Sequence, residues 1–172
     1  MRGGLALKVK QRMTLDPDLI WQTLNTIADP EIPVVSLVEL GVVREVQLDG
    51  ASVRVTITPT FAGCPAMHAM REEIVEKLTS IGLEQIELRT RLNPPWTTEW
   101  LSDEVRAKLT QFGLAPPPRH TGDLELALRE VVACPHCGSK DTVLDNAFGP
   151  TLCQSLHYCR ACQQSFQRFK PL

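Results

Sequence analysis

The sequence predicts an α+β fold: a small mixed β-sheet with helices, in the order α-β-β-α-β-α, followed by a C-terminal zinc ribbon. Three observations predict it. Helical and alternating apolar patterns succeed one another over the first two thirds of the chain. A run of prolines at residues 116–118 then interrupts them. Two C-x-x-C pairs follow, close to the C-terminus.

The first helix is predicted to begin after Asp16, whose carboxylate can cap it, with Pro17 in the first helical position. Apolar residues recur at helical spacing as far as Ile27. The pattern stops before Pro30, so we expect the helix to end near Asp29.

Two extended runs follow on either side of residues 49–50, an Asp-Gly pair. Apolar and polar side chains alternate along them, which is typical of a β-hairpin with one buried face. The apolar spacing becomes helical again at Pro65 and stops at Gly82. The sequence therefore predicts a second helix that starts directly after Cys64.

Residues 85–92 alternate once more and predict a third strand. A last helix is expected from Ser102, a good capping residue, to Phe112, with two acidic residues in its first turn. The connection from the second strand to the third runs through a helix and should be right-handed. The third strand is therefore expected to lie parallel to its neighbour.

Length and composition restrict the function. The 172 residues are 43% hydrophobic with a net charge of -2, so no excess of positive charge attracts nucleic acid or a membrane. The N-terminus lacks the apolar segment of a signal peptide, and no run approaches the ~18 apolar residues of a membrane span. We expect a cytoplasmic protein with a first domain at 1–114, a Pro-rich linker and connecting segment at 115–133, and a ribbon at 134–172.

The paired cysteines predict a structural metal site. In a reducing compartment, C-x-x-C pairs are typical of metal ligation rather than of disulfides. Two such pairs supply the four thiolates of a closed tetrahedral site for one zinc ion per chain, and here they are Cys134, Cys137, Cys159 and Cys162. A four-thiolate iron site is the alternative, because the same ligands accept iron.

Other side chains in this module leave the ligand set open. His136, His157 or Cys153 could replace a ligand or lie beside the metal. We favour the paired cysteines, because a C-x-x-C chelate already holds two sulfurs together, and we interpret Cys153 as a small buried hydrophobe. Nucleic-acid binding is not expected, since the module carries only a weak positive charge.

Cys64 stands apart from the other cysteines, between Gly63 and Pro65. A thiol at a helix N-terminus faces free backbone N–H groups, which lower its pKa and favour the thiolate. The thiolate is a nucleophile and a ligand for soft metals. An inert buried cysteine is the alternative, and a Cys-His nucleophile with His68 is another.

The segments "DPEIPVVSLVELGVVREV" and "TPTFAGCPAM" resemble the small α/β domain of SufT-type proteins of iron-sulfur cluster assembly. The motifs of that family include an acidic D-P-E segment and a loop cysteine, which Cys64 matches. The segment "NPPWTTEWLSDEVRAKL", the "GLAPP" spacer and the paired cysteines resemble one branch of the family, the D (PaaD) subunits of bacterial phenylacetyl-CoA epoxidase complexes. The resemblance runs from about Asp16 to the C-terminus.

The resemblance implies an accessory subunit in aerobic phenylacetate degradation, with epoxidation assigned to a separate di-iron subunit and an iron-sulfur reductase. Such a chain would hold iron or an iron-sulfur cluster transiently at Cys64 and deliver it to the epoxidase or to its reductase. Asp29 and Glu31 of the D-P-E segment are the candidate polar neighbours of Cys64, and Thr58 is a candidate for orienting its loop. No Glu-x-x-His pair or dinucleotide loop argues for an oxygenase in this chain.

Other functions remain open. A non-catalytic scaffold would dock through exposed Trp96 and Trp100 and would tolerate the loss of Cys64. An enzyme in its own right would use the Cys64 thiolate as its nucleophile. A general carrier of iron-sulfur clusters would need no epoxidase at all.

Overall fold

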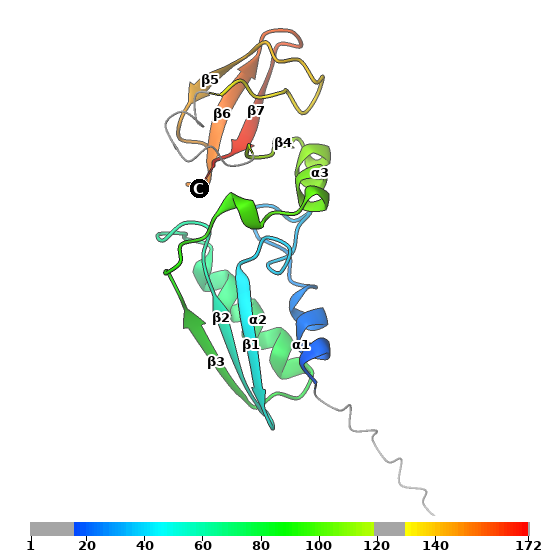
Figure 1. The fold of residues 1–172 in the computed structure, drawn as a ribbon, viewed down its shortest axis with the longest axis vertical. Helices are drawn as coiled ribbons and strands as arrows, with labels where there is room; N and C mark the ends of the chain where they lie inside the picture. The colour runs from blue at the N-terminus through cyan, green and yellow to red at the C-terminus, as the bar shows by residue number, and fades with distance from the viewer. Residues whose placement is uncertain (1–15, 119–129, 172) are drawn as a thin grey trace, which may run out of the picture.

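The computed structural model describes residues 16–118 and 130–171, which form two β-sheets joined by helices (Figure 1). The elements are α1 (Pro17–Leu24), β1 (Val43–Asp49), β2 (Ser52–Ile57), α2 (Met67–Ser80), β3 (Gln85–Thr90), η1 (Thr98–Trp100), α3 (Asp103–Phe112), β4 (Leu114–Ala115), β5 (Thr142–Asn146), β6 (Gln154–Cys159) and β7 (Gln164–Phe169). The predicted α+β fold with its order of helices and strands is confirmed.

The first sheet has the order β1-β2-β3. β1 and β2 form an antiparallel hairpin that turns at Gly50, whose φ of +60° favours glycine. β2 and β3 are parallel, with Ser52 opposite Gln85 and Ile57 opposite Thr90. The crossover through α2 therefore gives the parallel pair that the sequence predicts.

The first helix begins as expected but ends earlier. The Asp16 carboxylate accepts a hydrogen bond from the Leu19 N–H at 2.7 Å, and α1 then ends at Leu24 rather than near Asp29. The following residues turn back on themselves, because the Leu37 N–H donates to the Ile27 carbonyl at 2.9 Å. Ile27 remains fully buried, so its apolar spacing reflects the core and not a continued helix.

The helices α1 and α2 lie on one face of the first sheet (Figure 1). Their buried side chains, including Ile20, Leu24, Ile74 and Leu78, pack against Val53 and Val55 of the central strand. None of the helices in the described ranges is long and apolar enough to cross a membrane. β2 and β3 both run toward the second sheet, so the loop after β2 lies at the junction of the two sheets (Figure 1).

The second sheet has the order β4-β7-β6-β5. β4 follows α3 directly and pairs in parallel with β7, with Leu114 opposite Gln167. The two-residue strand therefore ties the end of the helical segment to the ribbon, although the sequence assigns Ala115 to a linker. Gly113, at φ +90°, makes the sharp turn from α3 into β4.

The hydrophobic core of the first domain extends into the ribbon, which also has a small core of its own. Cys153 and Phe169 belong to the ribbon, yet they are buried together with the core residues of the first domain. The Trp96 ring packs on Phe169 with 5.6 Å between the ring centroids. The junction is therefore a packed interface.

Candidate metal centres

The four paired cysteines converge at the end of the ribbon farther from the first sheet. The Sγ atoms of Cys134 and Cys162 lie 3.7 Å apart, those of Cys137 and Cys159 lie 3.6 Å apart, and all four lie within 4.8 Å of one another. A tetrahedral ion with metal–sulfur bonds of about 2.3 Å separates its sulfurs by about 3.8 Å. The four cysteines therefore have the spacing of a closed four-thiolate metal site.

The protonation of these thiols supports the same conclusion. Burial and the three neighbouring sulfurs raise the pKa of Cys162 to about 12, whereas the backbone N–H of Cys162 helps to lower the pKa of Cys159 to about 7. Four thiolates this close repel one another unless a cation neutralises them. The four cysteines can therefore all be thiolates together only when a metal cation binds them.

The other candidate ligands of the ribbon have different surroundings. His157 is buried, its ring stacks on Phe166 at 5.5 Å, and its Nε2 lies 3.1 Å from the Ser155 hydroxyl. His136 is exposed and approaches Gly113. Among the described residues, neither histidine joins the group of four sulfurs.

A second candidate site lies at the junction, around Cys64. This residue sits in the loop between β2 and α2, and α2 begins at Met67 rather than at Pro65. The backbone N–H groups of Ala66 and Met67, at the start of the helix, still act to lower the pKa of the Cys64 thiol, and the Met67 N–H donates to the Cys64 carbonyl at 3.3 Å. A small cavity of about 10 Å³ separates Cys64 from side chains of the ribbon, and it is lined by Glu31, Thr60, Phe61, Cys64, Pro65, Leu152 and Cys153.

The D-P-E segment contributes two carboxylates to this centre. Asp29 is buried, and its Oδ1 accepts hydrogen bonds from the N–H groups of Glu31 and Ile32, both at 2.8 Å. Asp29 thus fixes the turn that directs Glu31 to the cavity. Burial raises the pKa of Asp29, and burial followed by repulsion from Asp29 raises the pKa of Glu31.

The expected low pKa of Cys64 is wrong. Burial raises the pKa of the thiol, and the charges of Glu31 and Asp29 raise it further, while hydrogen bonds from the helix N-terminus oppose them without outweighing them. A helix N-terminus by itself favours the thiolate, but the two carboxylates lie beyond the reach of a local sequence pattern. The environment stabilises a neutral thiol or a thiolate that is paired with a cation.

Cys153 is the residue at this centre that sequence reasoning missed. It lies directly before β6 and is 6% exposed, as a small buried hydrophobe would be. Its sulfur, however, lies 3.7 Å from Glu31 Oε2 and 3.2 Å from the Thr151 hydroxyl. Burial, together with the charges of Glu31 and Asp29, raises its pKa to about 11. Only the presence of a fifth cysteine in a ribbon that already has four ligands hinted at a separate role.

The other residues predicted for a functional role, Thr58, Trp96 and Trp100, do not line the cavity at Cys64. Thr58 is 1% exposed, and its N–H donates to the Val42 carbonyl at 2.8 Å, so it ends β2 and does not line the cavity. Trp96 is only 4% exposed, and its Nε1–H donates to the Leu40 carbonyl at 2.8 Å. The expectation that Trp96 is exposed for docking is therefore wrong. Trp100 is half-buried, with the Arg44 guanidinium 3.5 Å from its ring centroid.

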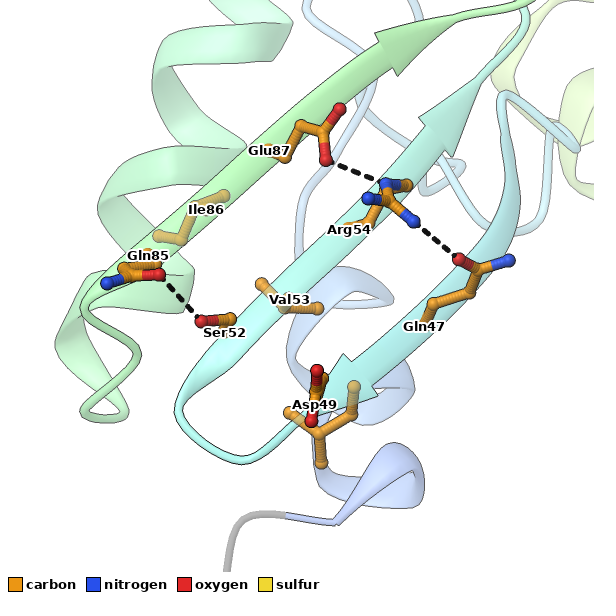
Figure 2. A pocket seen from close by; sticks show the side chains of 9 residues that line it. Gln47, Asp49, Ser52, Val53, Arg54, Gln85, Ile86 and Glu87 are labelled. Atoms are coloured by element: carbon orange, nitrogen blue, oxygen red, sulfur yellow. Dashed lines mark hydrogen bonds and ion pairs between the residues drawn. The ribbon is translucent and has the colours of Figure 1, made fainter.

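A larger hollow of about 710 Å³ lies on the first sheet, at the hairpin end far from the ribbon. Figure 2 shows its polar side chains paired across the strands: Arg54 donates to Glu87 at 2.7 Å and to Gln47 at 3.0 Å. Such cross-strand pairs stabilise a sheet surface. The paired groups leave no convergent set of ligands there, in contrast to the junction.

Fold and site together define a class of protein: a small iron-sulfur assembly type of α/β domain fused to a cysteine-liganded β-ribbon. Residues 17–87 match the family described as "Iron-sulfur cluster assembly protein", and residues 118–170 match "PaaD zinc beta ribbon domain". The chain is 38% identical over 151 residues to the putative D subunit of the 1,2-phenylacetyl-CoA epoxidase of Escherichia coli (strain K12), covering 88% of this chain and 90% of that protein. The chain belongs to this PaaD family, the D subunits of the 1,2-phenylacetyl-CoA epoxidases.

Two further comparisons concern the first domain. The chain is 33% identical over 93 residues to the "Fe-S protein maturation auxiliary factor" of Porphyromonas gingivalis, covering 52% of this chain and 87% of that protein. A crystal structure of a domain of unknown function, DUF59, from Bacillus anthracis superposes with a TM-score of 0.50 at 28% identity. That match covers 54% of this chain and 89% of the other, and it supports the fold of the first domain.

Proposed function

We propose that the chain is a non-catalytic accessory protein that delivers iron, or an iron-sulfur cluster, to a phenylacetyl-CoA epoxidase or to its iron-sulfur reductase. The observation that carries the proposal is the placement of Cys64, a partly exposed thiol beside two carboxylates at the junction. The relatives in cluster assembly and epoxidase families support it. The first domain is the part that these relatives share, and Cys64 lies within it.

The chemistry of the site suits transient cation binding. Sulfur and carboxylate ligands together accept iron, and the negative surroundings of Cys64 favour its thiolate only when a cation is bound. A partly exposed ligand can also be reached by an acceptor protein, whereas the four ribbon sulfurs together complete a closed tetrahedral site with no open position. The same surroundings disfavour a free thiolate nucleophile, which weakens the enzyme hypothesis.

We assign zinc to the four cysteines of the ribbon. A closed tetrahedral set of thiolates with the observed sulfur spacing fits the geometry of structural zinc. These residues would hold one zinc ion per chain: Cys134, Cys137, Cys159 and Cys162. The core of the ribbon is small, so the metal supplies the cross-link that keeps β5, β6 and β7 in register.

The test is co-expression of the epoxidase subunits with the wild-type chain, with Cys64→Ser or without this chain. Cys64→Ser hardly changes the volume of the side chain but removes a soft ligand. We expect lower iron occupancy and turnover of the epoxidase with Cys64→Ser. The matched control is Ala62→Ser, which adds a hydroxyl to the same exposed loop and keeps the thiol. It should behave as wild type.

The alternative of a pure scaffold predicts another pattern. If Cys64→Ser supports full iron occupancy while omission of the chain does not, delivery through this thiol is excluded and docking alone remains. Buried Trp96 cannot provide the docking surface directly, so the scaffold hypothesis would then have to use other exposed side chains.

A further inference from the structure

The junction brings two cysteines from distant parts of the chain to one cavity. Cys64 comes from the loop after β2, and Cys153 comes from the hairpin between β5 and β6. Glu31 lies between the two domains and contacts the Cys153 sulfur at 3.7 Å, across 122 positions of sequence. Neither cysteine is needed by the ribbon metal, whose four ligands lie elsewhere.

The cavity has the size of a single ion. Its volume of about 10 Å³ corresponds to roughly one water-sized sphere. A cluster with several iron and sulfide atoms would need the side chains around this space to move apart. A single divalent cation fits between the sulfurs and the carboxylate.

The charge around the cavity also favours a cation. Two thiols and the Glu31 carboxylate line it, the buried Asp29 carboxylate stands behind Glu31, and none of the described lining residues is basic. Thr151 approaches the Cys153 sulfur at 3.2 Å and can fix its rotamer. Thiolates with a carboxylate make a mixed soft and hard ligand set, which suits ferrous iron or zinc and not magnesium or calcium.

We propose that Cys64, Cys153 and Glu31 together form a mononuclear site for ferrous iron, so that the ribbon supplies the second thiolate of the delivery centre. This inference rests on the proposed function, and it names the cargo at that centre as a single ion. On binding, the ion displaces the protons of the two thiols, which leave to the solvent, and iron stays in the ferrous state.

The site closes on its ion through side-chain rotation. In the described part of the chain, the ribbon cysteines form the only group of three or more such ligand atoms already gathered at metal-binding distances. Glu31, Cys64 and Cys153 therefore need to move toward the ion. A site that is not fully preorganised binds less tightly than a structural one, and weak binding suits the release of a cargo.

The experiment is anaerobic titration of the full-length, zinc-loaded chain with ferrous iron alone, followed by iron K-edge absorption spectroscopy. We expect about one iron per chain with two sulfur ligands. Cys153→Ser and Cys64→Ser should each leave one sulfur ligand and weaken binding at least tenfold. The number of sulfur ligands per iron distinguishes a ligand from a residue that only packs at the site, because loss of a packing residue would not change that number.

Cys153→Ala provides a second variant, because alanine is compatible with a buried position even where serine is not. Ala62→Ser is the matched control, since it adds a hydroxyl to the exposed loop beside Cys64 and keeps both thiols; it should retain two sulfur ligands. An unchanged sulfur number in Cys153→Ser and Cys153→Ala overturns the inference and leaves delivery through Cys64 intact. The inference is also overturned if the zinc-loaded chain binds no iron, or if it binds iron only together with sulfide, as a cluster. In either case the co-expression experiment decides the proposed function separately.

Discussion

Replacement of Trp96 tests whether the ribbon packs into the core of the first domain. Its ring is 4% exposed, packs on Phe169 at 5.6 Å and donates its Nε1–H to the Leu40 carbonyl. Trp96→Ala removes the whole ring, which for a buried aromatic lowers the free energy of unfolding by about 3–5 kcal/mol. Trp96→Phe keeps most of the ring but leaves the Leu40 carbonyl unpaired, and this lowers the free energy of unfolding by about 1–3 kcal/mol.

The assay is urea-induced unfolding of zinc-saturated protein, followed by circular dichroism. A double-mutant cycle of Trp96→Leu with Phe169→Leu should give a coupling of about 0.5–1.5 kcal/mol if the rings stabilise each other. The control is Trp21→Phe, the same chemical change at a partly buried position on α1. A loss below ~1 kcal/mol for Trp96→Ala would refute the packed junction, because removal of a well-packed buried tryptophan destabilises a fold by more than that.

Two further predictions concern the ribbon and the contact between α3 and the loop before β1. Cys137→Ser should reduce the bound zinc to well below one ion per chain and unfold the ribbon strands, while the first domain keeps its helices. Metal analysis and amide hydrogen exchange would measure these two effects. A ribbon that stays folded without zinc would contradict the assignment of zinc. Burial raises the pKa of Glu39, but hydrogen bonds from Lys108 and Ser36 outweigh it and lower the pKa. A depressed carboxyl pKa stabilises the fold above the ordinary pKa of glutamate and ceases to do so as pH falls through the folded value. Lys108→Met should therefore destabilise the chain modestly at pH 7 and much less near pH 3, and equal effects at both pH values would exclude this ion pair as the cause.

The sequence alone predicted those parts of the structure that depend on residues near one another in the chain. The hairpin at Gly50, the helix capped by Ser102 and the metal group built from C-x-x-C pairs each depend on residues close together in the chain. The parallel pairing of β2 with β3 also followed, because the handedness of the crossover leaves few alternatives.

The junction could not be predicted in the same way. The contact between Glu31 and Cys153 spans 122 positions and forms only when the ribbon folds onto the first domain. The burial of Trp96 and the raised pKa of Cys64 have the same origin, since both depend on side chains that the fold brings together. An apolar aromatic next to a capping motif gives no signal of whether it faces solvent or another domain.

The strand β6 connects the two centres physically. Cys153 lies immediately before it and Cys159, one of the ribbon ligands, is its last residue. At about 3.3 Å per residue, the two sulfur-bearing positions lie roughly 20 Å apart, too far for one ion to bridge them or to pass between them without leaving the protein. A metal held by the ribbon would therefore act on the junction indirectly, by keeping β6 in register. Under the proposed function, iron would leave the chain through Cys64 while zinc stays, and loss of zinc would displace Cys153 from the cavity without removing either junction thiol.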